Sequence, residues 1–133
     1  MLSYQELINY LLSQDKYQYS IKPLYTVIHL PTYPDYHITI YQDQWDDYKL
    51  NTGKPYHLFH ISSNDEQNRC SSYFWVGTNT NKIQKIPRKY FKYNQPIYDY
   101  FSSTRSPCEL KKVIPLLKIL QKIINEAARK KID

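Results

Sequence analysis

Four short runs of β-branched and aromatic residues follow one another between residues 24 and 76, with breaker residues between them. They cover residues 24–30, 36–42, 56–62 and 72–76. Runs of this length and composition predict β-strands. Parallel neighbours would need a crossover helix, and no connection between the runs has a helical pattern of that length. The sequence therefore predicts an antiparallel meander, in which each strand pairs with the next.

Helical patterns lie on both sides of the predicted strands. Residues 3–6 (Ser-Tyr-Gln-Glu) have the spacing of a capping box, and the apolar positions that follow predict an amphipathic helix over about 4–14. Residues 106–109 (Ser-Pro-Cys-Glu) have the same spacing. They predict the start of the longest helix, about 107–131, in which Pro115 should produce a kink.

The order of these elements is typical of an α+β fold. We expect an N-terminal helix, a four-stranded antiparallel meander sheet and a long kinked C-terminal helix packed on that sheet. At 133 residues the chain is long enough to form one such domain, residues 1–133, with its own core. A basic segment, residues 82–101, lies between the sheet and the last helix.

The charges divide the chain into two unequal halves. Residues 1–68 carry four basic and eight acidic side chains, whereas residues 69–133 carry fourteen basic and four acidic ones. Such an asymmetry indicates an anionic partner for the C-terminal half, either nucleic acid or an acidic protein surface. The abundance of Tyr, Ile, Lys and Asn is typical of an AT-rich gene, and a small basic chain of this kind fits a phage or mobile-element origin.

The densest cationic stretch lies at residues 82–93, where five basic side chains are interleaved with three aromatic ones. Cations can contact phosphates, and aromatic rings can stack on unpaired bases. The last helix adds two lysines too far from its C-terminus to be explained by the helix dipole. The residues predicted to bind nucleic acid are Lys82, Lys85, Arg88, Lys89, Tyr90, Lys92, Tyr93, Lys118 and Lys122. The alternative is a solvated basic segment whose aromatic side chains fill the core.

The histidines suggest a second function, a metal-independent ribonuclease of toxin type. His37 lies in the run 36–42, and His57 and His60 lie in the run 56–62. If these strands are neighbours, either His57 or His60 can approach His37 across the sheet. Two such imidazoles can act as general base and general acid in RNA cleavage. The alternative is that they are core or surface residues, so the sequence leaves open whether the protein is an enzyme.

A third hypothesis is a protein-interaction inhibitor of a machine that handles nucleic acid. Trp45 and Tyr48 lie in an acidic, tyrosine-rich connection after the second predicted strand. Exposed Trp and Tyr side chains dominate the binding energy of many protein interfaces. The alternative is that Trp45 closes the core.

The remaining features exclude several classes of protein. Cys70 and Cys108 lie far apart with no CxxC spacing, which favours reduced thiols and a cytoplasmic protein, with a single disulfide as the alternative. We expect no membrane partner, because no apolar run is long enough to span a bilayer. His57 and His60 fall on opposite faces of a strand, so no metal site is predicted. With only two glycines, the chain has no phosphate-binding loop, and no cofactor is expected.

Overall fold

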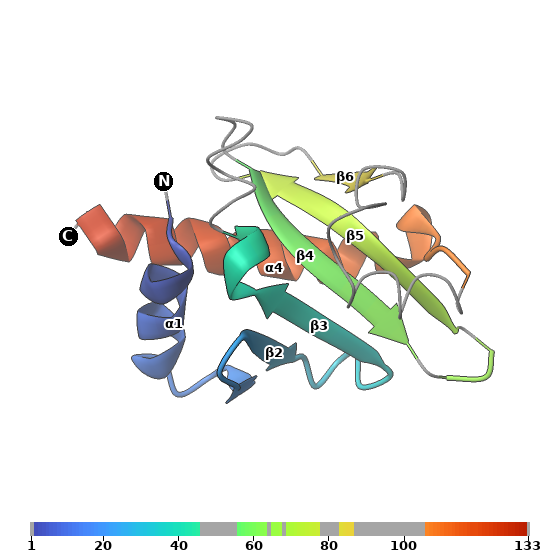
Figure 1. The fold of residues 1–133 in the computed structure, drawn as a ribbon, viewed down its shortest axis with the longest axis horizontal. Coiled ribbons are helices and arrows are strands. Elements are labelled where there is room, and N and C mark those ends of the chain that lie inside the picture. Colours follow the sequence, from blue (N-terminus) through green and yellow to red (C-terminus); the bar gives the residue numbers. More distant parts are fainter. Residues whose placement is uncertain are drawn as a thin grey trace.

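The computed structural model describes residues 2–45, 56–63, 65–67, 69–77, 83–86 and 106–132. Helix α1 precedes an array of strands, and helix α4 follows it (Figure 1). The elements are α1 (Tyr4–Leu12), β1 (Gln18–Ile21), β2 (Tyr25–His29), β3 (Tyr36–Tyr41), β4 (Tyr56–Ser63), β5 (Cys70–Gly77), β6 (Ile83–Ile86) and α4 (Leu110–Ile132). A helical turn at residues 42–45 follows β3.

The strands form one antiparallel sheet in the order β1-β2-β3-β4-β5-β6, so each strand pairs with the next along the chain. This confirms the predicted α+β class and the meander. The four predicted strands are β2 to β5. The sheet also contains two edge strands that were not predicted, β1 and β6, each only four residues long. Both lack the dense β-branched and aromatic pattern that identified the other four.

Helices α1 and α4 cover one face of the sheet. Figure 1 shows α4 crossing behind β4 and β5, with α1 beside its C-terminal half. The main core joins apolar side chains of both helices to those of the sheet, including Ile40, Phe59 and Phe74. The alternation of a strand places these side chains on one face, because directly paired residues such as Phe59 and Phe74 point the same way.

The start of α1 agrees with the prediction. Ser3 Oγ accepts from the Glu6 amide at 3.1 Å, and the Glu6 carboxylate accepts from the Ser3 amide at 2.9 Å. These two bonds satisfy orphan donors at the helix N-terminus and define where the helix begins. The helix ends at Leu12, slightly earlier than expected, because the amide of Ser13 already makes the capping contacts.

The start of α4 differs from the prediction. The helix begins at Leu110 and not at residue 107, and Ser106 does not act as its cap. Ser106 instead forms a parallel bridge with Cys70, and its carbonyl accepts from the Ser71 amide at 2.9 Å. Because this pairing keeps residues 106–108 extended along β5, helical geometry starts only after them. Pro115 lies inside α4, and the predicted kink there stays a prediction.

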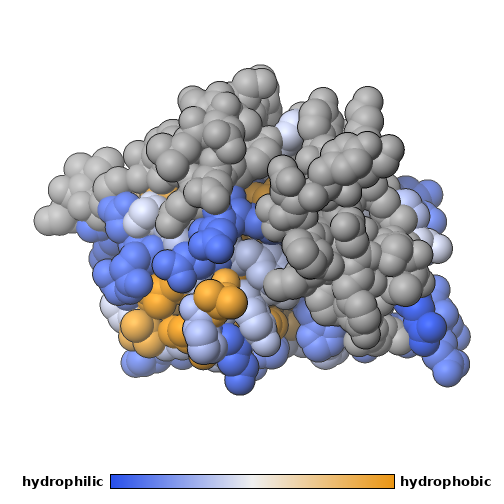
Figure 2. Space-filling view, in the orientation of Figure 1, coloured by the Kyte–Doolittle hydropathy of each residue, from blue (hydrophilic) through white to orange (hydrophobic). Residues whose placement is uncertain are grey.

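The other face of the sheet carries a smaller and more polar cluster. Leu58 and Tyr73 are buried there with Trp75 packed against them. Figure 2 shows the molecule from this side; over α1 and the first strands, hydrophobic residues reach the surface between hydrophilic ones. Among the described residues, the exposed large hydrophobic ones are Leu12, Ile21 and Leu24.

Candidate functional site

The outer side of α4 carries a straight row of cations. The row consists of Lys111, Lys118, Lys122 and Arg129, which are all exposed. At about 3.6 residues per turn, this spacing places all four within an arc of about 40° around the helix. At a rise of about 1.5 Å per residue, the row is roughly 27 Å long. We call these four residues the α4 cationic row.

Packing of the opposite side of α4 fixes the orientation of this row. Seven side chains there are at most 2% exposed: Val113, Leu116, Leu117, Leu120, Ile123, Ile124 and Ala127. Burial of each Leu or Ile stabilises the fold by about 1.5–3 kcal/mol relative to exposure. Rotation of α4 about its axis would expose this stripe, so the row stays on the surface.

Glu126 is the only acidic residue between residues 110 and 132. Its carboxylate is bonded mainly by the N-terminal region, and the charge of Lys122 in the row also lowers its pKa. Its Oε2 atom accepts from the hydroxyl of Tyr10 at 2.7 Å and from that of Tyr17 at 3.0 Å. Lys16 Nζ lies 3.5 Å from the same oxygen. These contacts come from α1 and the segment after it, so they tie the C-terminal half of α4 to the N-terminal region. We call this group the Glu126 cluster.

The hydrogen bond from Tyr10 is the main reason that the pKa of Glu126 lies below its ordinary value, and the Tyr17 bond and Lys16 act in the same direction. The pKa of Tyr10 is raised, chiefly by burial and then by its bond to the Glu126 carboxylate. Both shifts favour the observed arrangement, in which a neutral phenol donates to an ionised carboxylate. A surface pocket of about 360 Å³ adjoins this group, and Arg129 and Lys130 contribute to its lining.

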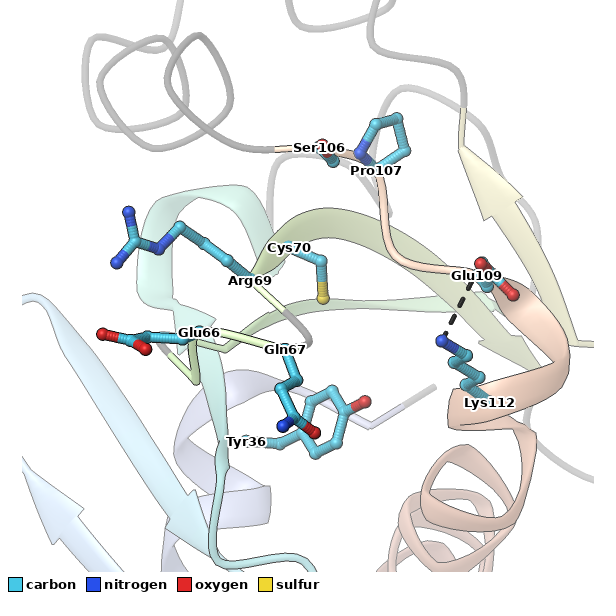
Figure 3. A pocket seen from close by; sticks show the side chains of 9 residues that line it. All are labelled: Tyr36, Glu66, Gln67, Arg69, Cys70, Ser106, Pro107, Glu109 and Lys112. Atoms are coloured by element: carbon cyan, nitrogen blue, oxygen red, sulfur yellow. Dashed lines mark ion pairs between the residues drawn. The ribbon is translucent and has the colours of Figure 1, made fainter.

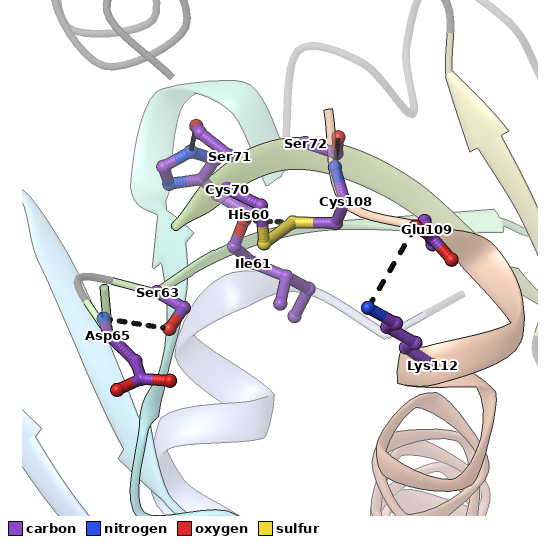
Figure 4. Close-up of a disulfide and its surroundings, with 10 residues drawn as sticks. All are labelled: His60, Ile61, Ser63, Asp65, Cys70, Ser71, Ser72, Cys108, Glu109 and Lys112. Carbon is purple, nitrogen blue, oxygen red and sulfur yellow. Dashed lines mark hydrogen bonds and ion pairs between the residues drawn. A yellow bond between two sulfur atoms is a disulfide. The ribbon is translucent and has the colours of Figure 1, made fainter. Parts of the chain in front are cut away.

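The N-terminal end of α4 is fixed by a disulfide between Cys70 of β5 and Cys108 (Figure 4). The Cys108 amide also donates to Ser72 Oγ at 2.8 Å. The prediction of reduced cysteines is therefore wrong for this structure, and the alternative of a single disulfide is correct. The sequence could not separate the two, because the cysteines are 38 positions apart and only the pairing of residues 106–108 with β5 brings them together.

A second pocket, of about 370 Å³, lies beside this disulfide (Figure 3). One wall comes from the start of β3 and the connection between β4 and β5: Tyr36, Glu66, Gln67, Arg69 and Cys70. The other wall comes from the segment leading into α4: Ser106, Pro107, Glu109 and Lys112. The disulfide joins the two walls covalently. We call this the disulfide pocket.

Most of the predicted nucleic-acid-binding residues lie outside the described part of the chain. These are Lys82, Arg88, Lys89, Tyr90, Lys92 and Tyr93. Lys85 lies in β6, where its backbone pairs with Phe74. The remaining two, Lys118 and Lys122, are central members of the α4 cationic row.

The three histidines proposed as catalytic do not converge on one accessible position. His37 is exposed, and His60 is 2% exposed on the same face of the sheet, where it contacts Ser71 Oγ at 2.8 Å. His57 is 3% exposed on the opposite face and stacks on Trp45, with ring centroids 4.4 Å apart. His60 is therefore the nearer candidate to pair with His37, as adjacent strands place them diagonally.

The surroundings of His60 are aromatic and do not resemble an open cleft. Its ring centroid lies 4.7 Å from that of Tyr73 and 6.1 Å from that of Tyr41. Burial raises the pKa of Tyr41 to about 12, so its hydroxyl stays protonated at neutral pH. A ribonuclease mechanism would need substrate to reach a side chain that is almost completely covered.

Trp45 is not an exposed anchor for a protein partner. It is 2% exposed, its indole nitrogen donates to the Leu2 carbonyl at 3.1 Å, and its ring meets Phe59 edge-on. These contacts close the core between the N-terminus and the sheet, so the partner-binding hypothesis is wrong for this residue and the alternative, that Trp45 closes the core, is confirmed. Tyr48, the other residue of that prediction, lies outside the described residues.

The described residues contain neither a candidate metal site nor a helix suited to a membrane. No three His, Cys, Asp or Glu side chains among them come together as a group that could hold a metal ion. None of the helices in this part of the chain has the length and hydrophobicity needed to cross a membrane.

Comparison with known proteins identifies a viral relative. It is 61% identical over 126 residues to Uncharacterized protein R703 of Acanthamoeba polyphaga mimivirus, and the match covers 95% of this chain and 93% of the relative. The chain belongs to the family of that mimivirus protein. No family model matches it, and no solved structure matches it. Membership of this mimivirus family is compatible with a viral origin, where the sequence alone suggested a phage or mobile element.

Sequence reasoning did not identify the Glu126 cluster or the disulfide pocket. Glu126 lies more than a hundred positions from Tyr10, and no local pattern links them. The pocket depends on how the segment before α4 lies along β5. In both cases the tertiary structure determines which residues come together, and hydrophobic periodicity along the sequence does not predict these contacts.

Proposed function

We propose that the protein binds nucleic acid through the α4 cationic row. The observation that supports this most is the alignment of four cations opposite a fully buried apolar stripe, with the one acidic residue of the helix engaged by α1. Cations placed only for solubility would be expected at scattered surface positions mixed with acidic ones. The basic segment at residues 82–93 would add contacts of the same kind, on the basis of its composition.

The α4 cationic row is suited to contacts with phosphate groups and not to sequence-specific contacts with bases. Duplex DNA carries about one negative charge per 1.7 Å of its axis, so a row roughly 27 Å long can contact several phosphates of one backbone. Phosphate contacts fix the position of a protein but carry no sequence information. We therefore expect binding with little base preference, driven by the release of counterions.

A salt titration tests the proposal. Fluorescence anisotropy of labelled single- and double-stranded oligonucleotides should give affinities that fall steeply between about 50 and 200 mM salt, with a log–log slope near −0.9 for each phosphate contacted. A flat response, or no binding at the lowest salt, would contradict the proposal.

Two matched double variants separate the row from net charge. Lys118→Gln with Lys122→Gln removes two cations of the row, whereas Lys112→Gln with Lys130→Gln removes two cations that lie on the same helix but off the row. The first pair should reduce the magnitude of the salt slope by about 2 and weaken low-salt binding by roughly tenfold or more. The second pair should have a clearly smaller effect. Equal losses would mean that total charge, and not the row, determines binding.

A further inference from the structure

The disulfide pocket places a reactive bond at the base of a solvent-accessible depression. Both cysteines belong to the main core, but they differ in exposure: Cys70 is 7% exposed and contributes to the pocket lining, whereas Cys108 is 1% exposed. Figure 3 shows the Cys70 sulfur among the side chains that line the pocket. The pocket lining therefore includes Cys70 but not Cys108.

We propose that the Cys70–Cys108 bond is a site of reversible thiol–disulfide exchange with small-molecule thiols, and that the incoming thiolate attacks Cys70 from the pocket. The pocket volume of about 370 Å³ suits a small thiol. It lies near the lower end of the range for ligand pockets, so it is too small to admit the folded active site of a protein reductase. This inference does not depend on nucleic-acid binding.

The surroundings of the leaving group act in two opposite ways. Attack on Cys70 expels the Cys108 sulfur as a thiolate, and Cys108 lies two residues before the first residue of α4. The positive end of a helix dipole stabilises a thiolate, and a more stable thiolate leaves faster. Burial of Cys108 in the apolar core and the Ile61 carbonyl 3.6 Å from its sulfur disfavour the thiolate, so the direction of attack rests on the place of Cys70 in the pocket lining.

The steps balance without a metal or cofactor. The thiolate RS⁻ forms a bond to Cys70 Sγ, the bond between the two cysteine sulfurs breaks, and Cys108 leaves as a thiolate that takes up a proton. A second thiolate then attacks the sulfur of the bound R group and releases RSSR, and Cys70 takes up the second proton. Two electrons pass from two thiols to the protein, and an excess of a small disulfide reverses the two steps.

Reduction should loosen the link between the two pocket walls. In the oxidised protein this link comprises the disulfide, the bond from the Ser71 amide to the Ser106 carbonyl and the bond from the Cys108 amide to Ser72 Oγ. The two hydrogen bonds remain possible after reduction, but nothing covalent then holds residues 106–108 against β5. We expect hydrogen exchange at the Ser71 and Cys108 amides to accelerate by about tenfold or more on reduction.

The test is to map where a thiol attaches. The oxidised full-length protein is mixed with 2-mercaptoethanol, quenched with acid at early times, unfolded, alkylated with N-ethylmaleimide and analysed by mass spectrometry. We expect the mixed disulfide on Cys70 and the alkyl group on Cys108, with at least about tenfold excess over the reverse pattern. Attachment mainly to Cys108 would overturn the proposal. So would a purified protein whose thiols stay free in excess oxidised glutathione.

A pocket-filling variant provides the matched control. Gln67 is an exposed residue of the pocket wall, and Gln18 is an exposed residue of β1. Gln67→Trp should slow the reaction with 2-mercaptoethanol by roughly fivefold or more, because access to Cys70 governs the rate. Gln18→Trp should leave the rate unchanged. Equal rates in the two variants, with unchanged circular dichroism, would show that the thiol does not enter through the pocket.

Discussion

The two ends of α4 are fixed to the molecule by different chemistry. Near its N-terminus a disulfide joins Cys108 to Cys70, and hydrogen bonds hold the preceding residues along β5. Near its C-terminus the carboxylate of Glu126 accepts two hydrogen bonds from tyrosines of the N-terminal region. The first link depends on redox state and the second on the ionisation of a carboxylate. One helix is thus held by two contacts that respond to different conditions.

Between these ends, apolar packing holds the helix by a large but non-directional interaction. The stripe from Val113 to Ala127 keeps the cationic row outside, while the two end contacts hold the ends of the helix against the rest of the molecule. If the apolar stripe alone sets the orientation of α4, loss of either end contact should destabilise the protein but leave the cationic row on the surface.

Loss of the disulfide should have the largest effect on stability. For a loop closed by cysteines separated by 38 positions, chain entropy alone predicts a contribution of about 4 kcal/mol to the free energy of unfolding. We expect Cys70→Ser with Cys108→Ser to lower the melting temperature by roughly 10–15 °C in calorimetry.

Reduced wild-type protein is the control for that variant, because it has the same sequence as the oxidised form. Its melting temperature should be close to that of the double variant. If reduction leaves the melting temperature unchanged while the variant is destabilised, the effect comes from the serines and not from the lost bond.

Glu126→Gln should have an intermediate effect that depends on pH. The variant loses a charged acceptor of two hydrogen bonds, which should cost about 1–2 kcal/mol at pH 7. The pKa of Glu126 in the folded protein is lowered from its ordinary 4.5, so near that pH the folded state binds fewer protons than the unfolded chain. Its contribution is complete above pH 4.5 and is lost as the pH falls through the folded-state pKa.

The stability curves of the wild type and this variant should therefore converge in acid. Urea unfolding at pH 7 and at several values below 4.5 provides the measurement. A constant difference across this range would assign the effect of the substitution to packing and not to the carboxylate charge. The disulfide variants should show no such convergence.

Much of the fold could be predicted because its signals are local. The capping box at Ser3 and Glu6 and the four strands β2 to β5 each depend on neighbouring residues in the sequence. The start of α4 could not be predicted in the same way. The sequence at Ser106 has good capping spacing, but pairing with β5 and the disulfide hold this segment extended, so a tertiary contact overrides the local preference.

The residues of the candidate site also differ in whether a local sequence pattern could place them. Lys118 and Lys122 could be placed on the outer side of the last helix, because helical periodicity alone separates them from the apolar stripe. For Trp45 the sequence left two alternatives, a partner-binding residue or core closure, and the structure confirms core closure over Leu2 and His57. The periodic part of the site was thus predictable, and the part set by long-range contacts was not.

Tyr17→Phe should have the smallest effect, and it tests whether the Glu126 cluster acts as a unit. The substitution removes the hydroxyl that donates to Glu126 at 3.0 Å but keeps the ring over which Lys16 Nζ lies, 5.0 Å from the centroid. Because the acceptor is charged but the site is partly solvated, we expect a loss of about 1 kcal/mol at pH 7.

A double-mutant cycle with Glu126→Gln then measures the coupling between these two side chains. A coupling energy of about 0.5–1 kcal/mol is expected, since the bond from Tyr17 should weaken when the acceptor loses its charge. Strict additivity would show that Tyr17 stabilises the fold through its ring. In that case only the 2.7 Å bond from Tyr10 and the ion pair with Lys16 would connect the N-terminal region to Glu126, and the C-terminal contact would be weaker than two hydrogen bonds imply.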